Sequence, residues 1–201
     1  MYTHEREVQA MLDMVSDMFP SAEAPGNHDR TFLEPACGSG NFLEEILHRK
    51  LSTVTTRRYG RGEKYEHRVL RCLASIYGVD IDYENVMESR DRLRAAIASH
   101  LDRDMNTVAP TEGLALAVEA ILESNIVVGD SLNEPHKVPL VHYRPTKVGF
   151  FLREWTYLEE GEDPGQPDLF GIREIERRRD REPIHYSLLT QHPDPYPGVL
   201  P

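Results

Sequence analysis

The sequence predicts an α/β protein with a mostly parallel sheet. Short apolar stretches typical of strands alternate with longer segments in which apolar residues recur at helical spacing. The predicted strands end in glycines and carboxylates, as is common at the carboxyl ends of strands in open α/β sheets. Strand–helix alternation favours parallel pairing because each helix returns the chain to the end of the sheet from which the next strand starts.

The amino-terminal part contains the first elements of this pattern. An apolar stripe at helical spacing predicts a helix over residues 5–18, which Pro20 interrupts. A short strand is predicted over 31–33, and helical spacing resumes over 42–47 after a glycine-rich turn. Residues 51–64 are polar and basic and are interpreted as an insertion.

The next elements repeat the alternation. A helix that begins near Tyr65 leads into a strand over 75–79, and Asp82 is placed to cap a long helix after it. Beyond a linker around Pro110, another helix leads into a strand over 125–128.

The carboxyl-terminal part has a weaker pattern. A fourth strand is expected over 147–152, followed by a charged loop over 159–166 and a charged helix over 171–182. We therefore expect one domain over 1–152 and a charged, proline-rich extension over 153–201, with a sheet that is incomplete or irregular on its carboxyl-terminal side.

Composition is that of a globular protein, with 39% hydrophobic and 28% charged residues. No apolar run approaches the roughly 18–20 residues that a membrane span needs, and the first residues lack the apolar core of a signal peptide. Cys37 and Cys72 have no metal-ligand spacing, so we expect no metal site and a reduced, cytoplasmic setting. Oligomeric state is left open.

The formal net charge of −11 bears on possible partners. A protein that holds duplex DNA alone usually has a basic face, so two routes to DNA are left open for this acidic chain: direct binding, or binding through a partner subunit or a separate recognition domain. The basic residues gather in two clusters, which are interpreted as solvated faces or as contacts for nucleic acid: Arg57, Arg58, Arg61, Lys64 and Arg68, and Arg173, Arg177, Arg178, Arg179 and Arg181.

The most specific motif lies between the first strand and its helix, in the segment Glu34-Pro35-Ala36-Cys37-Gly38-Ser39-Gly40-Asn41-Phe42-Leu43. Its glycines allow a ligand to approach the backbone closely, and the helix start offers free N–H groups. The segment resembles the D-P-A-C-G-S-G-x-F-L motif of the adenine-N6 DNA methyltransferases, including type I modification subunits, with Glu34 in place of aspartate. It differs from a dinucleotide fingerprint because Phe42 or Leu43 replaces the third glycine.

This resemblance implies a Rossmann-like class I methyltransferase fold that binds S-adenosylmethionine. Glu34, Ala36 and Gly38 would line the methionine end of that cofactor. A carboxylate such as Asp80, at the end of the second strand, can accept hydrogen bonds from a ribose, and by resemblance Ile81 would pack on the adenine. The implied cofactor-binding residues are Glu34, Pro35, Ala36, Cys37, Gly38, Gly40, Asn41 and Phe42, then Asp80 and Ile81, and, by resemblance at the third strand end, Asp130, Ser131 and Leu132.

The family's fourth motif, Asn/Asp/Ser-Pro-Pro-Tyr/Phe, which holds the target amine, is not found. The nearest match, Asp194-Pro195-Tyr196-Pro197, lies too late in the chain, and catalytic residues are not assigned. Trp155, Tyr157 and Phe170 are interpreted as core or interface residues rather than as base-stacking residues. The expected function is S-adenosylmethionine-dependent methylation, with DNA adenine N6 as target, by this chain or as part of an enzyme. The alternatives are a degenerate cofactor-binding module acting as a partner or regulatory subunit, and a methyltransferase for a non-DNA substrate.

Overall fold

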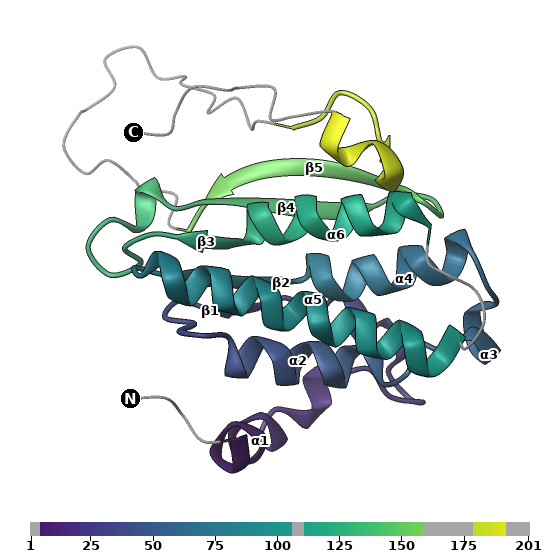
Figure 1. Cartoon of the computed structure of the whole chain (residues 1–201), viewed down its shortest axis with the longest axis horizontal. Coiled ribbons are helices and arrows are strands. Elements are labelled where there is room, and N and C mark those ends of the chain that lie inside the picture. The colour runs from purple at the N-terminus through teal and green to yellow at the C-terminus, as the bar shows by residue number, and fades with distance from the viewer. Residues whose placement is uncertain (1–4, 106–110, 159–178, 192–201) are drawn as a thin grey trace.

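The computed structural model describes residues 5–105, 111–158 and 179–191, which form a mixed α/β structure (Figure 1). The helices are α1 (Glu5–Asp13), α2 (Asn41–Leu51), α3 (Thr56–Tyr59), α4 (Glu63–Ala74), α5 (Tyr83–Met105) and α6 (Glu112–Asn125). The strands are β1 (Phe32–Glu34), β2 (Ile76–Asp80), β3 (Ile126–Val128), β4 (Pro139–Pro145), β5 (Phe150–Tyr157) and β6 (Ile184–His185). Short 3₁₀ helices are η1 (Ser16–Met18), η2 (Pro25–Asp29), η3 (Pro135–Lys137) and η4 (Tyr186–Gln191).

A three-stranded parallel sheet of order β1-β2-β3 forms the centre of the fold. Glu34 pairs with Gly78, and Asp80 pairs with Val128, so the three strands end at one edge. The predicted α/β class and parallel pairing are confirmed, and each of these strands lies within one residue of its predicted position.

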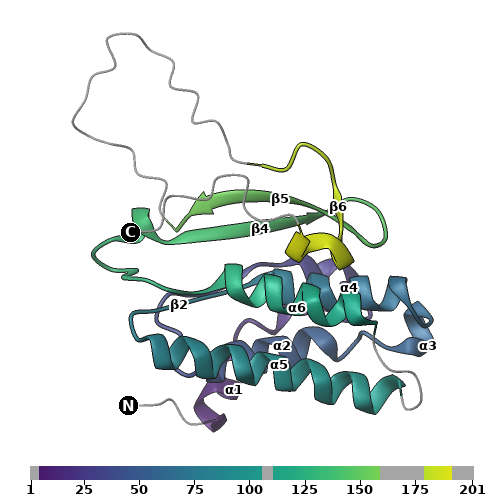
Figure 2. The same ribbon diagram turned by 45° about the horizontal axis from the view of Figure 1, so that its top comes forward.

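Different elements cover the two faces of this sheet. Helices α2 and α5 pack together and against β2 on one face (Figure 2). On the other face Val138 and Leu140, before and within β4, pack on Tyr77, Val79 and Val127. Because α4 runs into β2 and α6 runs into β3, these two helices extend the central layer beyond the amino-terminal ends of the strands (Figure 1).

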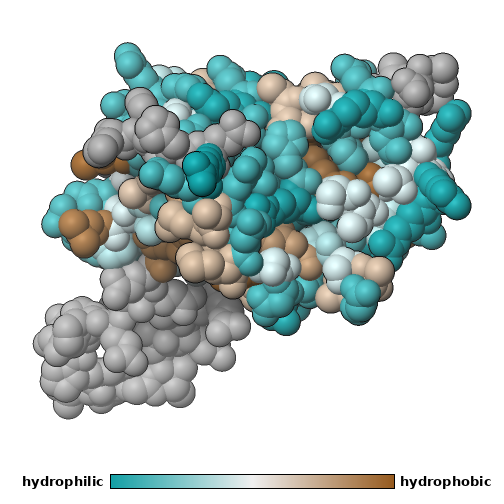
Figure 3. Space-filling model, turned by 90° about the horizontal axis from the view of Figure 1, so that it is seen from below, coloured by the Kyte–Doolittle hydropathy of each residue, from teal (hydrophilic) through white to brown (hydrophobic). Residues whose placement is uncertain are grey.

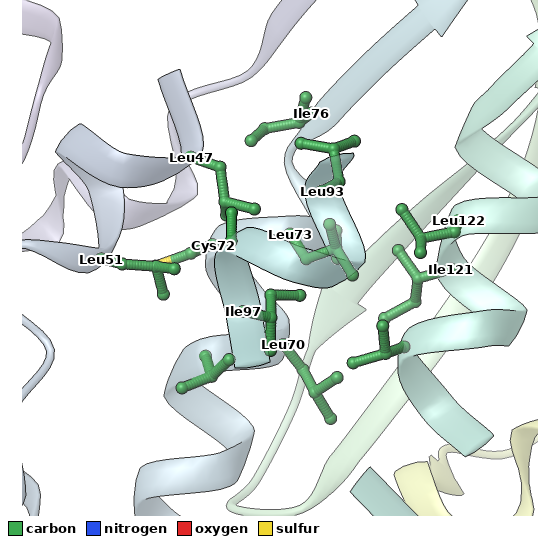
Figure 4. Packing of buried hydrophobic residues seen from close by; sticks show 14 of the residues in the cluster. Leu47, Leu51, Leu70, Cys72, Leu73, Ile76, Leu93, Ile97, Ile121 and Leu122 are labelled. Carbon is green, nitrogen blue, oxygen red and sulfur yellow. The ribbon is translucent and has the colours of Figure 1, made fainter. Parts of the chain in front are cut away.

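The main core lies where the helices meet the central layer. Figure 4 shows side chains from α2, α4, α5, α6 and β2 converging on one another. Those labelled there are Leu47, Leu51, Leu70, Cys72, Leu73, Ile76, Leu93, Ile97, Ile121 and Leu122, all of which are buried. Cys72 therefore packs as a small apolar residue.

The predicted fourth strand was wrong in its bounds. Residues 147–149 form a turn, in which Gly149 has φ +82°, and the strand begins at Phe150. Residues 151–157 of this strand, β5, pair antiparallel with all of β4, in a second sheet of order β4-β5-β6. The sequence analysis predicts no strand over 139–145 and no second sheet.

Two predicted helices also differ from the structure. Helix α1 ends at Asp13 rather than near residue 18, because Val8 and Leu12 are buried whereas Met14 is exposed and gains nothing from a longer helix. Of the charged helix predicted over 171–182, residues 171–178 lie outside the described part. Residues 179–182 are not helical, since Arg179 forms a β-bridge with Glu154.

Residues 179–191 return to the domain. β6 pairs with β5, and η4 packs on α6. The proposed boundary after residue 152 stays a prediction, although β5 continues through it to Tyr157. The charged loop over 159–166 and the proline-rich end lie outside the described residues. Among the helices described, none combines the length and the apolar character that crossing a membrane requires.

Candidate functional site

Hydrogen bonds join the three loops at the carboxyl edge of the parallel sheet. The Cys37 N–H donates to the Val79 carbonyl at 2.8 Å, and the Gly129 N–H donates to the Asp80 carbonyl at 2.9 Å. The Ser131 hydroxyl donates to the Pro35 carbonyl at 2.5 Å. The three segments singled out in the sequence, around residues 34–42, 80–82 and 129–132, are thus brought together at one edge.

The glycine-rich turn runs from β1 into α2. Gly38 and Gly40 have φ values of +53° and +90°, in the left-handed region that glycine adopts without strain. Gly40 is the N-cap of α2 and lies against Ser89 of α5: a Cβ at position 40 would be 2.5 Å from the Ser89 Oγ. Asn41 and Phe42 form the first turn of α2, where backbone N–H groups lack helical partners.

Asp80 fixes the loop after β2 to the glycine-rich turn. Its Oδ2 accepts the Gly38 N–H at 2.8 Å, while its Oδ1 accepts the Asp82 N–H at 2.9 Å and the Asn85 side-chain amide at 3.1 Å. Burial by itself would raise the pKa of Asp80, but these three hydrogen bonds outweigh it, and the pKa lies below its ordinary value. Asp80 is therefore a carboxylate at neutral pH.

The two residues after Asp80 have different roles. The Asp82 carboxylate accepts the Glu84 N–H at 2.8 Å at the start of α5, which confirms its interpretation as a cap. Ile81 is 73% exposed, although it is a large apolar side chain. It lies directly beside the Asp80 carboxylate along the chain.

The loop after β3 also places an exposed apolar residue close to an aspartate. Asp130 accepts hydrogen bonds from the N–H groups of Leu132 and Asn133 and from the Asn133 side-chain amide. The bonds from Asn133, with that from Leu132, lower the pKa of Asp130. Leu132 is 87% exposed, so a second apolar side chain stands in solvent next to a carboxylate.

Glu34 and Cys37 form the inner part of the edge. Burial raises the pKa of Glu34, partly opposed by the Ala36 N–H. Cys37 is buried, and burial together with the Asp80 charge raises its pKa to about 12, so it is a neutral thiol rather than a nucleophile. Pro35 and Ala36 are exposed on the rim.

Three residues of this edge were missed by the sequence analysis. Asn85 and Asn133 each bind one of the two carboxylates, and no periodic pattern marks them. Gly78 is required because Leu43 packs so closely that a Cβ would be 2.5 Å from its Cδ1. A glycine inside a buried strand is the one available signal for such a contact.

The other features considered from the sequence were a metal site, three aromatic residues and a near match to the fourth motif. Among the described residues no three His, Cys, Asp or Glu side chains gather as a metal site. Trp155 is partly buried against the core, Tyr157 is half-buried, and Phe170 lies outside the described residues. The near match to the fourth motif at 194–197 also lies outside them.

In comparisons with known proteins, no protein family, no characterised protein and no solved structure matches this chain. Its candidate site rests on the geometry described above.

Proposed function

We propose that the carboxyl edge of the parallel sheet binds S-adenosylmethionine and that the protein is a methyltransferase of the Rossmann-like class. The observation that supports this most is the pairing of an exposed apolar residue with a carboxylate at two adjacent strand ends, Ile81 with Asp80 and Leu132 with Asp130. An adenosine presents an apolar ring to be covered, and an amine and hydroxyl groups to be hydrogen-bonded. The two pairs match both needs.

The hydrogen-bonding capacity of the two carboxylates fits this ligand. A carboxylate offers about four acceptor sites, and Asp80 and Asp130 each use three within the protein. Each retains room for one more donor: a ribose hydroxyl at Asp80 and the exocyclic amine of adenine at Asp130. The backbone of Gly38 and the first turn of α2 would hold the methionine end.

The proposed reaction is methyl transfer to the N6 amine of adenine in DNA. When bound, S-adenosylmethionine supplies an electrophilic methyl group. The residues of this chain would bind and orient the cofactor, and the resemblance of the glycine-rich turn to the adenine-N6 family supports DNA as the substrate. Activity on another substrate is an alternative that product analysis separates.

A second candidate function is a cofactor-binding subunit that lacks its own transfer site. The specific observation in its favour is that β1 is an edge strand, since in the described part of the chain the sheet has the order β1-β2-β3. The strand after β3 joins the antiparallel sheet instead, and the sequence lacks the Asn/Asp/Ser-Pro-Pro-Tyr/Phe motif. A partner would then supply the groups that hold the target amine.

Cofactor binding is tested by calorimetry with S-adenosylmethionine. Ile81→Ser and Leu132→Ser should each weaken binding about tenfold, because each removes a contact of roughly one to two kcal/mol with the adenine. Their thermal stability should be unchanged, since both side chains are exposed. Met14→Ser, which alters a 77% exposed side chain on the segment after α1, is the matched control and should bind normally. Equal affinity in all three variants would overturn the site.

Transfer is tested on the same protein with labelled cofactor and unmethylated DNA. Formation of labelled N6-methyladenine would establish that the protein is an enzyme. Asp130→Asn should form less of this product, because the variant should bind the cofactor more weakly. Cofactor binding without transfer to DNA would support the subunit, whose activity should appear when a partner chain is added.

A further inference from the structure

Five basic side chains on α3, the turn after it and the first half of α4 form a concentrated positive surface on an acidic protein. We call this the α3–α4 basic surface: Arg57, Arg58, Arg61, Lys64 and Arg68. All are exposed except Arg68, which is half-buried. None of the five forms an ion pair with any residue in the part of the chain that the structure describes.

Basic residues elsewhere in the protein are commonly paired. Arg49 binds Asp13 and Glu45, and Arg92 binds Glu44 and Glu88. Arg94, Lys137 and Arg153 likewise pair with carboxylates. With 34 acidic and 23 basic residues in the chain, carboxylates are in excess, so five neighbouring cations without partners are not explained by a shortage of anions.

The carboxylates nearest in sequence are bound to other groups. Glu63 lies 2.8 Å from the His185 imidazole. Glu66 is buried and accepts hydrogen bonds from the Thr111 hydroxyl and the Tyr186 hydroxyl, each at 2.6 Å. These contacts turn the acidic side chains of α4 away from the basic ones and leave the cations to solvent.

The aromatic ring of Tyr59 orders part of this surface. The guanidinium carbons of Arg58 and Arg68 lie 5.6 Å and 4.9 Å from its centroid, within the range of cation–π contacts. Gly60 and Gly62 have positive φ values and turn the chain sharply between α3 and α4, which places Arg61 in the bend. Two cations are thus held in place before any ligand binds.

The α3–α4 basic surface lies at the opposite end of the molecule from the carboxyl edge. Helix α5 starts next to Asp80 at that edge, and its last turn reaches α3, where Asp104 accepts the Thr56 N–H at 2.6 Å. At about 1.5 Å per residue, its 23 residues span roughly 34 Å. Figures 1 and 2 both show α3 at the far end of α5, and Figure 3 shows hydrophilic side chains along that end.

We infer that the α3–α4 basic surface binds the sugar–phosphate backbone of a nucleic acid and anchors it away from the carboxyl edge. Unpaired arginines and lysines are the groups that contact phosphates, and they act without reading base sequence. A membrane surface is disfavoured, because none of the large exposed apolar side chains lies between residues 55 and 68. At 3.4 Å per base pair, a duplex that touches both ends of the protein would need about ten base pairs between them.

The test is fluorescence anisotropy with a labelled 20-base-pair DNA duplex and a matched RNA, without S-adenosylmethionine. The wild-type protein should bind at low salt, with an affinity that falls steeply as salt rises. The triple variant Arg57→Ala/Arg61→Ala/Lys64→Ala should bind at least about tenfold more weakly and show a log–log salt slope smaller by two to three. The matched control Arg92→Ala/Arg94→Ala/Lys137→Ala removes the same charge from paired residues and should bind within about twofold of wild type.

Binding of either nucleic acid with loss confined to the first variant supports the inference. No binding by the wild-type protein, or equal loss in both triple variants, overturns it. Binding to vesicles of acidic phospholipid without binding to nucleic acid also overturns it. Because the assay contains no cofactor, its outcome is separate from that of the proposed methyltransferase site.

Discussion

Two glycines in the turn at the carboxyl edge are required by backbone conformation, and one of them is also required by close packing. Gly40 combines a φ of +90° with a neighbour, Ser89, whose Cα would be 2.9 Å from an added Cβ. Gly38 has a φ of +53° but open space around it. The same turn therefore contains one glycine required by backbone conformation and packing together, and one required by conformation alone.

We expect Gly40→Ala to lower the free energy of unfolding by about 2–4 kcal/mol, from roughly 1–2 kcal/mol of left-handed strain plus overpacking against Ser89. Gly38→Ala should cost only the strain, about 1–2 kcal/mol. Gly26→Ala, at a position without a positive φ and with nothing within 4 Å, should be close to neutral. Urea unfolding of the three variants measures the differences, and equal losses at 40 and 38 would contradict the packing contribution.

At the scale of elements, a buried ion pair joins the carboxyl-terminal segment to β5. The Arg153 guanidinium donates two hydrogen bonds to Asp180 at 2.9 and 3.0 Å, and the Arg153 N–H donates a third. Both side chains are 6% exposed. A buried pair of this kind contributes little net energy when intact, but leaves an uncompensated charge when one partner is removed.

Asp180→Asn should therefore lower the free energy of unfolding by about 3 kcal/mol. Hydrogen exchange should accelerate in β5, β6 and η4 before it does in the parallel sheet, because the segment of residues 179–191 would detach first. Glu154→Gln, which alters a half-exposed pair with Arg144 at 3.7 Å, is the control and should cost less than about 0.5 kcal/mol. Similar exchange in both variants would show that the buried pair does not hold the segment.

The elements that sequence could predict are those with uninterrupted local patterns. The three parallel strands and helices α2, α4, α5 and α6 follow apolar periodicity and were placed within a few residues. Strand β4 was missed; it begins and ends with proline, a residue that is uncommon in strands because it cannot donate to the ladder. The pairing of β5 with β4 depends on a turn at 147–149. β6 and η4 pack on elements that are distant in the sequence, and no local pattern encodes contacts of that kind.

For the whole molecule, the sequence predicted which loops would meet but not what holds them. Parallel pairing is enough to bring strand ends to one edge, so the positions of Glu34, Asp80 and Asp130 follow from the fold class. The hydrogen bonds from Asn85 and Asn133 depend on side-chain directions. The buried Lys50, whose amine donates to two carbonyls and a hydroxyl, contradicts the usual exposure of lysine and could not be foreseen.

We expect the fold to be sensitive to acid, chiefly because of His28 and His67; another buried histidine, His100, also has a lowered pKa, mainly through burial. His28 donates to the Pro25 carbonyl and lies against the Thr53 hydroxyl, while His67 accepts the Gly149 N–H and stacks on Phe151. Burial is the main cause that lowers the pKa of each to about 4 from an ordinary value near 6.5. Both residues are therefore neutral in the folded protein at pH 5.

The unfolded chain binds protons at these histidines below pH 6.5, and the folded protein does so only near pH 4. The free energy of unfolding should thus be highest above pH 6.5 and should fall as the pH drops from 6.5 to 4. At pH 5 the decrease should be about 2 kcal/mol for each histidine. Urea unfolding at pH 7 and pH 5 measures this difference. His28→Gln and His67→Gln should each reduce it by about 2 kcal/mol, whatever they do to stability at pH 7. His136→Gln, at an exposed position, should leave the difference unchanged, and an unchanged difference in the two buried variants would assign the acid sensitivity to other groups.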